Sequence, residues 1–279
     1  MSAKPISTPS GTPTTGPNST AESVRVDGYD GYDTVTQYTA KQLLAAWAAT
    51  AVPMGLLAWV ATPWLSHRLG GPDPFISALL ICFLAGLVWE IALLLFLVHR
   101  EQGSLQRSRV CAALWLRKPT SPRTRRTGGK VWWWTVPFVL LSAVINGVGI
   151  DPAGPIPRDL PVTLEHARTR LEHYFHANWG AFALLVAVAL LAPIVEELFF
   201  RGLLLPRMRA AFGKADVVVN GLIFGLHHLH QPWSMPASVI DGICSQAYPS
   251  KRFQSIWIAI IAHTAPSLVI IGAAVPLVL

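Results

Sequence analysis

The residues best suited to chemistry are two adjacent carboxylates, Glu196 and Glu197, with Arg201 four positions after the second. No charged residue occurs over 179–191, so the three end an apolar segment. Ionisable groups at membrane depth are costly and usually line a functional cavity. On a helix, Glu197 and Arg201 share a face and can pair, whereas Glu196 points about 100° away. A helix end with a surface salt bridge is the alternative interpretation.

Two further polar pairs lie in the apolar segments that follow. Phe224 and His228 are four residues apart, and so are His263 and Ser267. A single histidine on an apolar face is usually a hydrogen-bonded core residue. Two of them beside a carboxylate pair favour one site built from neighbouring membrane helices. The helical period predicts that His228, and not its neighbour His227, shares the face of Phe224.

In order and spacing, these residues resemble the motifs of the CAAX protease and bacteriocin-processing family. Glu-Glu-x-x-x-Arg stands at 196–201, Phe-x-x-x-His at 224–228, and a histidine motif at 263–267. The resemblance covers about residues 181–275 and departs at Ser267, where the family usually has asparagine. The family comprises intramembrane endopeptidases, among them the Ras-converting CAAX prenyl protease. The resemblance therefore implies peptide hydrolysis inside a membrane.

Peptide hydrolysis needs an activated water, a proton donor for the leaving amine and a stabiliser of the oxyanion. We expect Glu196 to be the general base, His228 to share the water or deliver the proton, and His263 to donate to the oxyanion. In the family, the asparagine that matches Ser267 helps to form the oxyanion hole; a serine hydroxyl can also donate, but it is shorter. The other motif residues are expected to support these groups: Glu197, Arg201 and Phe224.

No cofactor is expected, with zinc as the alternative. Glu196, His228 and His263 are a ligand set that catalytic zinc can use. However, the chain has no His-Glu-x-x-His motif, and the family is regarded as using glutamate without an obligatory metal. A serine-nucleophile mechanism through Ser267 is disfavoured, because nothing at close spacing supplies a triad.

Two classes of function follow from these residues. The first is an intramembrane endopeptidase that acts on a membrane-associated protein or peptide. The second is a catalytically weak family member that acts as a membrane binding or bacteriocin-immunity-type protein, and Ser267 is the feature that favours it. Intramembrane carboxylates also serve transporters and channels, but no inverted repeat supports that class. Nothing in the sequence indicates whether a substrate is prenylated.

Composition places the chain among multi-pass membrane proteins. Of its 279 residues, 52% are hydrophobic and 13% are charged, and the mean hydropathy is +0.43. These values do not describe a soluble globular protein. The formal charge of +7 comes from basic residues in loops beside apolar segments, so it indicates orientation in a membrane and not nucleic-acid binding. The three cysteines are isolated and predict neither a disulfide nor a metal site.

The pattern predicts an all-α, polytopic membrane bundle with about seven transmembrane helices and additional interfacial helices. The predicted spans cover residues 43–65, 75–98, 131–150, 179–209, 217–229, 233–247 and 256–279, with the sixth the weakest. The predicted interfacial helices cover 104–116 and 164–175. Glu90 is a lone carboxylate within the second span, and a structural bond to a neighbouring helix is the favoured interpretation.

Residues 1–40 are rich in Ser, Thr, Pro and Gly and are expected to form a disordered cytoplasmic tail, followed by one integral membrane domain over 41–279. The most basic loop covers residues 100–130. We expect the protein to lie in the cell membrane. The positive-inside rule places the basic loop and the N-terminus on the cytoplasmic side of that membrane. Anionic lipid headgroups are its expected contacts.

Overall fold

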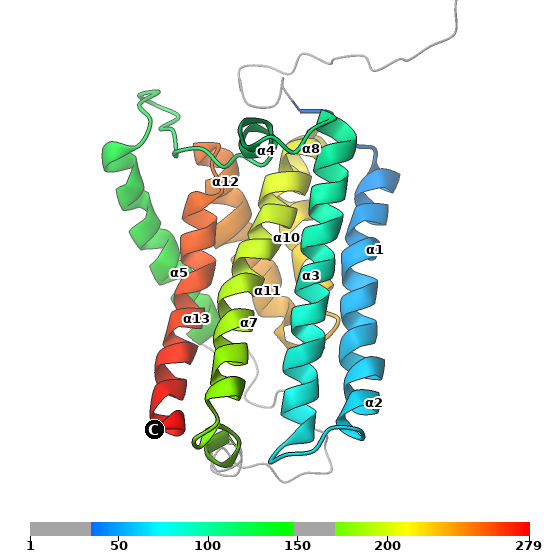
Figure 1. Ribbon diagram of the computed structural model, residues 1–279. Helices are drawn as coiled ribbons and strands as arrows, with labels where there is room; N and C mark the ends of the chain where they lie inside the picture. Colours follow the sequence, from blue (N-terminus) through cyan, green and yellow to red (C-terminus); the bar gives the residue numbers. More distant parts are fainter. Residues whose placement is uncertain (1–34, 148–170) are drawn as a thin grey trace, which may run out of the picture.

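The computed structural model describes residues 35–147 and 171–279 of the chain, and Figure 1 shows them as a bundle of helices. Within these two ranges there is no β-strand, and one isolated β-bridge joins Thr120 to Thr127. The predicted all-α class is therefore confirmed for this part of the chain. The predicted tail over 1–40 and the predicted interfacial helix over 164–175 fall largely outside the described residues.

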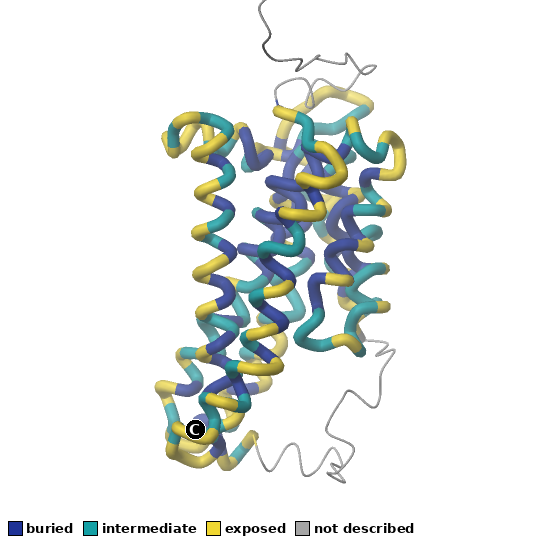
Figure 2. Tube along the Cα trace, turned by 90° about the vertical axis from the view of Figure 1, so that its right-hand side faces the viewer, coloured by how far each residue is buried: buried dark blue, intermediate teal, exposed yellow. Residues whose placement is uncertain are grey.

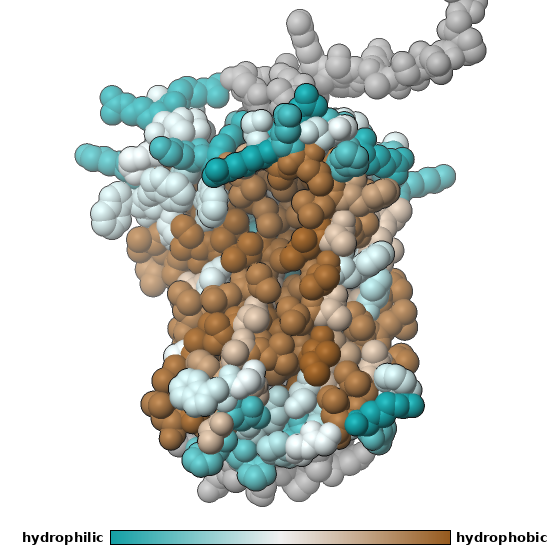
Figure 3. Space-filling model, in the orientation of Figure 1, coloured by the Kyte–Doolittle hydropathy of each residue, from teal (hydrophilic) through white to brown (hydrophobic). Residues whose placement is uncertain are grey.

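Four helical stretches, counted over the described residues, are long and apolar enough to cross a membrane. They are Ala40–Ser66 (27 residues), Pro74–Gln102 (29 residues), Trp179–Arg207 (29 residues) and Trp257–Val278 (22 residues). Each is longer than the ~20 residues that a helix needs to span the hydrocarbon core of a bilayer. Figure 3 shows their side chains as a broad apolar band between two polar ends, as expected of a membrane protein.

Some of these stretches contain several of the elements labelled in Figure 1. The first comprises α1 (Ala40–Leu56), the π-helical turn η1 (Leu57–Ala61) and α2 (Thr62–Ser66), and the second is α3 (Pro74–Gln102). The third comprises α7 (Trp179–Glu197), the π-helical turn η3 (Leu198–Leu204) and α8 (Leu205–Arg207), and the fourth is α13 (Trp257–Val278). α7 packs against both α3 and α13, which places it at the centre of the bundle.

Helices also stand where the sequence predicts three further spans, but they are not among the four candidate spans of the described residues, so the count of seven spans is not confirmed. They are α5 (Thr135–Gly147), α10 (Asp216–His227) and a series after η5 (Pro232–Ser234) that consists of α11 (Met235–Asp241), the π-helical η6 (Gly242–Ala247) and α12 (Tyr248–Phe253). α10 has 12 residues. At 1.5 Å per residue it is about 18 Å long, which is short of the ~30 Å hydrocarbon core.

α10 ends near the middle of the bundle. It begins at the end that carries the basic loop, and α11 and α12 return toward that same end (Figure 1). Its last residue, His227, lies 3.2 Å from Glu90, which is close to the middle of α3. The hairpin of α10 and α11 therefore carries a helix end, with its polar side chains, into the interior of the bundle.

Two glycines let α10 approach the returning helix closely. A Cβ atom at Gly221 would lie 2.3 Å from Ile243 Cγ1 and 2.7 Å from the backbone nitrogen of Ile243. A Cβ atom at Gly225 would lie 2.2 Å from Val239 Cγ2. Small residues four positions apart allow this kind of contact between membrane helices. The backbone of α10 is therefore in direct contact with α11 and η6.

Buried residues gather in the half of the bundle nearest the basic loop (Figure 2). One hydrophobic cluster there joins α1, α3, η3 and α10, and its aromatic members are Phe199, Phe200 and Phe224. The basic loop contributes α4 (Arg107–Ala113), which is shorter than the interfacial helix predicted over 104–116. Leu114 and Trp115 follow this helix and are almost fully buried, so this end of the basic loop is anchored in the bundle.

Arg207 ties the chain together at that end. It is fully buried, and its guanidinium donates to Glu101 at 2.5 Å and to the backbone oxygens of Leu203 and Ala113 at 2.7 and 3.2 Å. The Tyr38 hydroxyl donates to the same carboxylate. Burial and the neighbouring Glu101 raise the pKa of Tyr38. The segment before α1, the end of α3 and the end of α8 are thereby joined through one carboxylate.

The close approach of α10 predicts the effect of a single added methyl group. Gly221→Ala should destabilise the protein by about 1–3 kcal/mol, because Ile243 and its backbone must shift. Gly272→Ala on α13 is the control, since a Cβ atom there meets nothing within 4 Å. Thermal unfolding in detergent measures both variants. Equal stability of the two variants would contradict the described packing of α10 against η6.

Candidate active site

Glu197, the last residue of α7, is the centre of a buried polar network. Its Oε1 accepts a hydrogen bond from Arg201 Nη1 at 3.0 Å and one from His263 Nδ1 at 2.9 Å. The Glu197 and Arg201 side chains are both fully inaccessible to solvent. The predicted pairing of these two residues is thus present, although the turn between them is π-helical. Such π-helical turns are common at functional sites.

Arg201 also joins three separate elements. Its guanidinium lies over the ring of Phe224 on α10, 4.0 Å from the ring centroid, and its Nη2 donates to the backbone oxygen of Gly242 in η6 at 3.2 Å. A Cβ atom at Gly242 would lie 3.1 Å from that Nη2 and 2.8 Å from Phe224 Cδ1. The arginine therefore holds η3, α10 and η6 at fixed distances from one another.

His263 on α13 connects this network to Glu196. Because its Nδ1 is bonded to Glu197, its other nitrogen, Nε2, faces Glu196 at 3.7 Å from Oε2. A carboxylate bonded to one ring nitrogen sets the orientation and tautomer of a histidine. The sequence predicts that Arg201 holds Glu197; it does not predict that Glu197 in turn orients His263.

Accessibility separates the network into two parts. The side chains of Glu197 and Arg201 have no exposed surface, whereas Glu196 retains 10% and His263 retains 20%. The inner pair is therefore sealed inside the bundle. Glu196 and His263 are the members of this network that keep some exposed side-chain surface.

His228 follows the last residue of α10, so the short length of α10 sets its depth in the bundle. Its ring packs edge-on against Phe224 at a centroid distance of 4.9 Å, as the spacing predicts, and Phe224 also contacts the His263 ring at 5.6 Å. His228 Nδ1 is 3.0 Å from the Phe224 backbone oxygen. A carbonyl oxygen can only accept, so Nδ1 carries the proton and Nε2 keeps its lone pair.

The remaining predicted residue, Ser267, lies one turn beyond His263 on α13 and is half-buried. Within the described part of the chain, no hydrogen bond joins it to Glu196, and no ion pair joins His228 to Glu196. The structure thus brings Glu196 and His263 side by side. The rings of His228 and His263 both contact the ring of Phe224. Ser267 stands on the adjacent turn.

The three side chains considered for zinc do not form a ligand group. Among the residues that the structure describes, no set of three or more His, Cys, Asp or Glu side chains is close enough to hold a metal ion. The mechanism proposed below uses only the side chains of the chain itself.

A second buried pair stands behind Glu196. Glu90 on α3 is 1% exposed, His227 is fully buried, and Glu90 Oε1 lies 3.2 Å from His227 Nε2. Glu90 also interacts electrostatically with Glu196. The favoured interpretation of Glu90 as a bond to a neighbouring helix agrees with this contact. Its partner was not predicted, although an isolated carboxylate in the middle of a span and an unassigned histidine beside a motif were both visible signals.

Asp241 of α11 is a further buried carboxylate close to the network. Its Oδ2 accepts hydrogen bonds from Ser142 at 3.1 Å, from Asn146 at 3.2 Å and from Gln246 at 3.0 Å. It also interacts electrostatically with Arg201 and His263. α5 is therefore attached to the wall of the site through this carboxylate. In the sequence, Asp241 was only the single charge of a weak predicted span.

Together, the helices and the buried network define a polytopic membrane protein with an ionisable site inside its bundle. Residues 178–269 match the family model described as type II CAAX prenyl endopeptidase Rce1-like, and this segment contains every motif residue of the site. The match covers this segment of the chain and confirms the resemblance seen in the motifs. No curated protein and no solved structure matches the chain significantly.

The contact between α3 and α10 leads to a stability prediction. Glu90→Leu should lower the unfolding free energy by about 1–3 kcal/mol, because it leaves the buried His227 ring without the polar group that it faces. The double variant Glu90→Leu/His227→Leu should recover most of this loss, since it removes both polar groups. Unfolding of the purified variants in detergent gives the comparison. A double variant no more stable than the single one would show that the pair is not coupled.

Proposed function

We propose that the protein is an intramembrane endopeptidase that hydrolyses a peptide bond of a membrane-associated protein or peptide. The observation that carries the proposal is the pairing of two partly exposed groups, Glu196 Oε2 and His263 Nε2, which lie 3.7 Å apart. Both lie beside the fully buried ion pair of Glu197 and Arg201. Membership in a family of CAAX prenyl endopeptidases supports peptide hydrolysis as the reaction.

Glu196 is the proposed general base. Arg201 and His263 Nδ1 donate their hydrogen bonds to the neighbouring Glu197, so the carboxylate of Glu196 remains available to a water molecule. Glu196 takes one proton from this water while the water oxygen attacks the carbonyl carbon of the substrate. His228 Nε2, which keeps its lone pair, accepts a hydrogen bond from the second hydrogen and orients the water.

His263 is the proposed oxyanion donor. In this role the His263 ring is the imidazolium form, so that Nδ1–H donates to Glu197 and Nε2–H donates to the oxygen that becomes negative when the tetrahedral intermediate forms. The Ser267 hydroxyl, one turn away, is the proposed second donor. Glu196 then returns its proton to the leaving nitrogen as the C–N bond breaks. The products are a carboxylic acid and an amine, and the enzyme regains its starting protonation.

Ser267 favours the second candidate, a membrane protein that binds a peptide and cleaves it weakly or not at all. The family usually has an asparagine at this position, and a serine hydroxyl is shorter than an asparagine amide. In that case the same network would hold a bound peptide in place. Cleavage and binding assays on one peptide separate the two candidates.

The proposed setting is a cell membrane, with lipids and a membrane-associated peptide as partners and with no nucleic acid. We assign the basic loop and the N-terminal tail over 1–40 to the cytoplasmic side, and one membrane domain to 41–279. In Figure 1 the basic loop and residues 35–39 lie at the same end of the bundle, which supports a shared side. The excess of Lys and Arg in the loop supports the cytoplasm as that side.

The test is peptide cleavage in proteoliposomes, followed by mass spectrometry. The probes are a farnesylated peptide that ends in cysteine, two aliphatic residues and a variable residue, and its non-prenylated twin. Glu196→Gln should lower the rate about 10²- to 10⁴-fold on whichever peptide is cleaved, because the amide cannot accept a proton. The fold should persist, since the amide has nearly the same shape.

Glu172→Gln is the matched control, because it makes the same change outside the site. Glu172 lies shortly before Ala177, whose backbone nitrogen donates to the Val278 oxygen at the C-terminal end of α13. It should cleave at the wild-type rate. Wild-type rates in Glu196→Gln would overturn the proposed base. Binding of the peptides by a wild-type protein that cleaves neither would favour the second candidate.

A further inference from the structure

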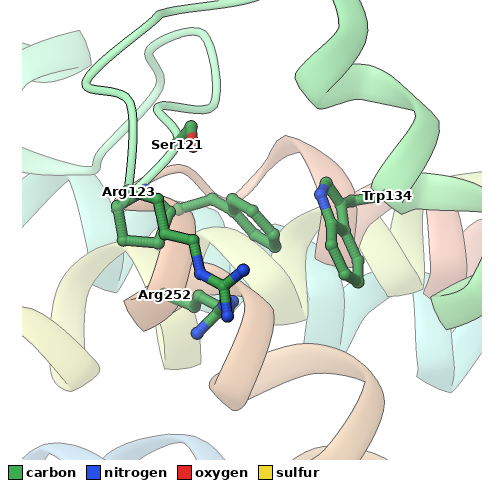
Figure 4. A pocket seen from close by; sticks show the side chains of 6 residues that line it. Ser121, Arg123, Trp134 and Arg252 are labelled. Carbon is green, nitrogen blue, oxygen red and sulfur yellow. The ribbon is translucent and has the colours of Figure 1, made fainter.

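A small hollow lies away from the site described above, at the end of the bundle that carries the basic loop. The side chains around it come from the loop, from the end of the 3₁₀ helix η2 (Gly129–Trp134) and from α12 (Figure 4). The lining residues are Ser121, Pro122, Arg123, Trp134, Arg252 and Phe253. None of them belongs to the proposed catalytic network.

Two positive charges meet at this hollow without a negative one. Arg123 and Arg252 both line the hollow (Figure 4), and no acidic side chain is among the lining residues. Asp216, the first residue of α10, pairs with Lys251 of α12 and with Arg209. Two guanidinium groups that line one small hollow repel each other unless an anion lies between them.

The hollow is preformed by its backbone. The Thr120 nitrogen donates to the Phe253 oxygen at 2.9 Å, which fastens the loop to α12, and the Ser121 nitrogen donates to the Arg126 oxygen at 2.9 Å, which closes the loop on itself. Phe253 is 1% exposed and forms a fixed apolar wall. The side chain of Arg252 lies over this ring, with its guanidinium 5.8 Å from the centroid.

Size and position narrow the class of ligand. The hollow encloses about 140 Å³, which is below the roughly 300–1,000 Å³ of sites for drug-sized ligands. It therefore suits one small anionic group. Trp134 is 48% exposed and ends a run of three tryptophans beside the apolar α5. Tryptophans at such positions lie at the level of the lipid headgroups.

We propose that this hollow binds the phosphate of an anionic phospholipid headgroup. Arg123 and Arg252 donate hydrogen bonds to the phosphate oxygens, since the planar guanidinium matches phosphate geometry. Trp134 packs along the apolar part of the same lipid. A zwitterionic headgroup such as phosphatidylcholine brings a cation toward the two arginines and should bind more weakly. The proposal does not depend on the peptidase activity.

The experiment counts retained lipids on the full-length protein by native mass spectrometry, with phosphatidylglycerol and phosphatidylcholine titrated separately. Arg123→Gln/Arg252→Gln should weaken phosphatidylglycerol binding about ten- to hundred-fold, because two charge-assisted hydrogen bonds are lost. Arg107→Gln/Arg126→Gln removes the same charge from the same loop outside the hollow and should change it less than about threefold. Arg123→Lys/Arg252→Lys keeps the positive charges but lacks the planar pair of N–H donors of a guanidinium, so it should weaken phosphatidylglycerol binding by an intermediate factor.

Three results would overturn the proposal. Equal losses in the two Gln pairs would mean that a diffuse basic surface, and not this hollow, attracts the lipid. Equal retention of phosphatidylcholine and phosphatidylglycerol would remove the argument from charge. Displacement of the lipid by millimolar inorganic phosphate, with the phosphate then retained in its place, would assign the hollow to a free anion. Thermal unfolding of each variant confirms that the comparison is made on folded protein.

Discussion

The buried ion pair of Glu197 and Arg201 is the interaction on which the rest of the site depends. Neither side chain has exposed surface, so neither charge can be stabilised by water if the other is removed. The pair receives further contacts from other elements: His263 on α13, Phe224 on α10 and the Gly242 oxygen of η6. Those elements must therefore meet at one point for the charges to be tolerated at all.

The length of α10 is the second constraint. A helix of 12 residues cannot cross the bilayer, so its C-terminal end stops inside the bundle. Within it, His227 reaches Glu90 in the middle of α3, and the next residue, His228, turns back onto Phe224. Because the helix ends at this depth, its polar C-terminal end lies inside the bundle and not at a membrane surface. The short hairpin of α10 and α11 and the ion pair of Glu197 and Arg201 thus have the same effect: both bring polar groups together at one depth in the bundle.

Sequence periodicity predicted contacts within a helix well. The spacing of four predicted the pairing of Glu197 with Arg201 and the contact of His228 with Phe224, and long apolar runs predicted α1, α3, α7 and α13. Periodicity carries no information on depth or on partners from distant segments. The end of α10 at mid-height, the bond from His263 to Glu197 and the partner of Glu90 therefore appear only when the helices are assembled.

The claim that the ion pair holds the site together is tested most directly by unfolding a pair of variants. Arg201→Met leaves Glu197 buried without its cation, whereas Glu197→Gln/Arg201→Met removes both charges. The account predicts that the single variant loses about 3–5 kcal/mol of stability and that the double variant regains a large part of it. Wild-type stability of Arg201→Met, or losses that simply add in the double variant, would contradict it.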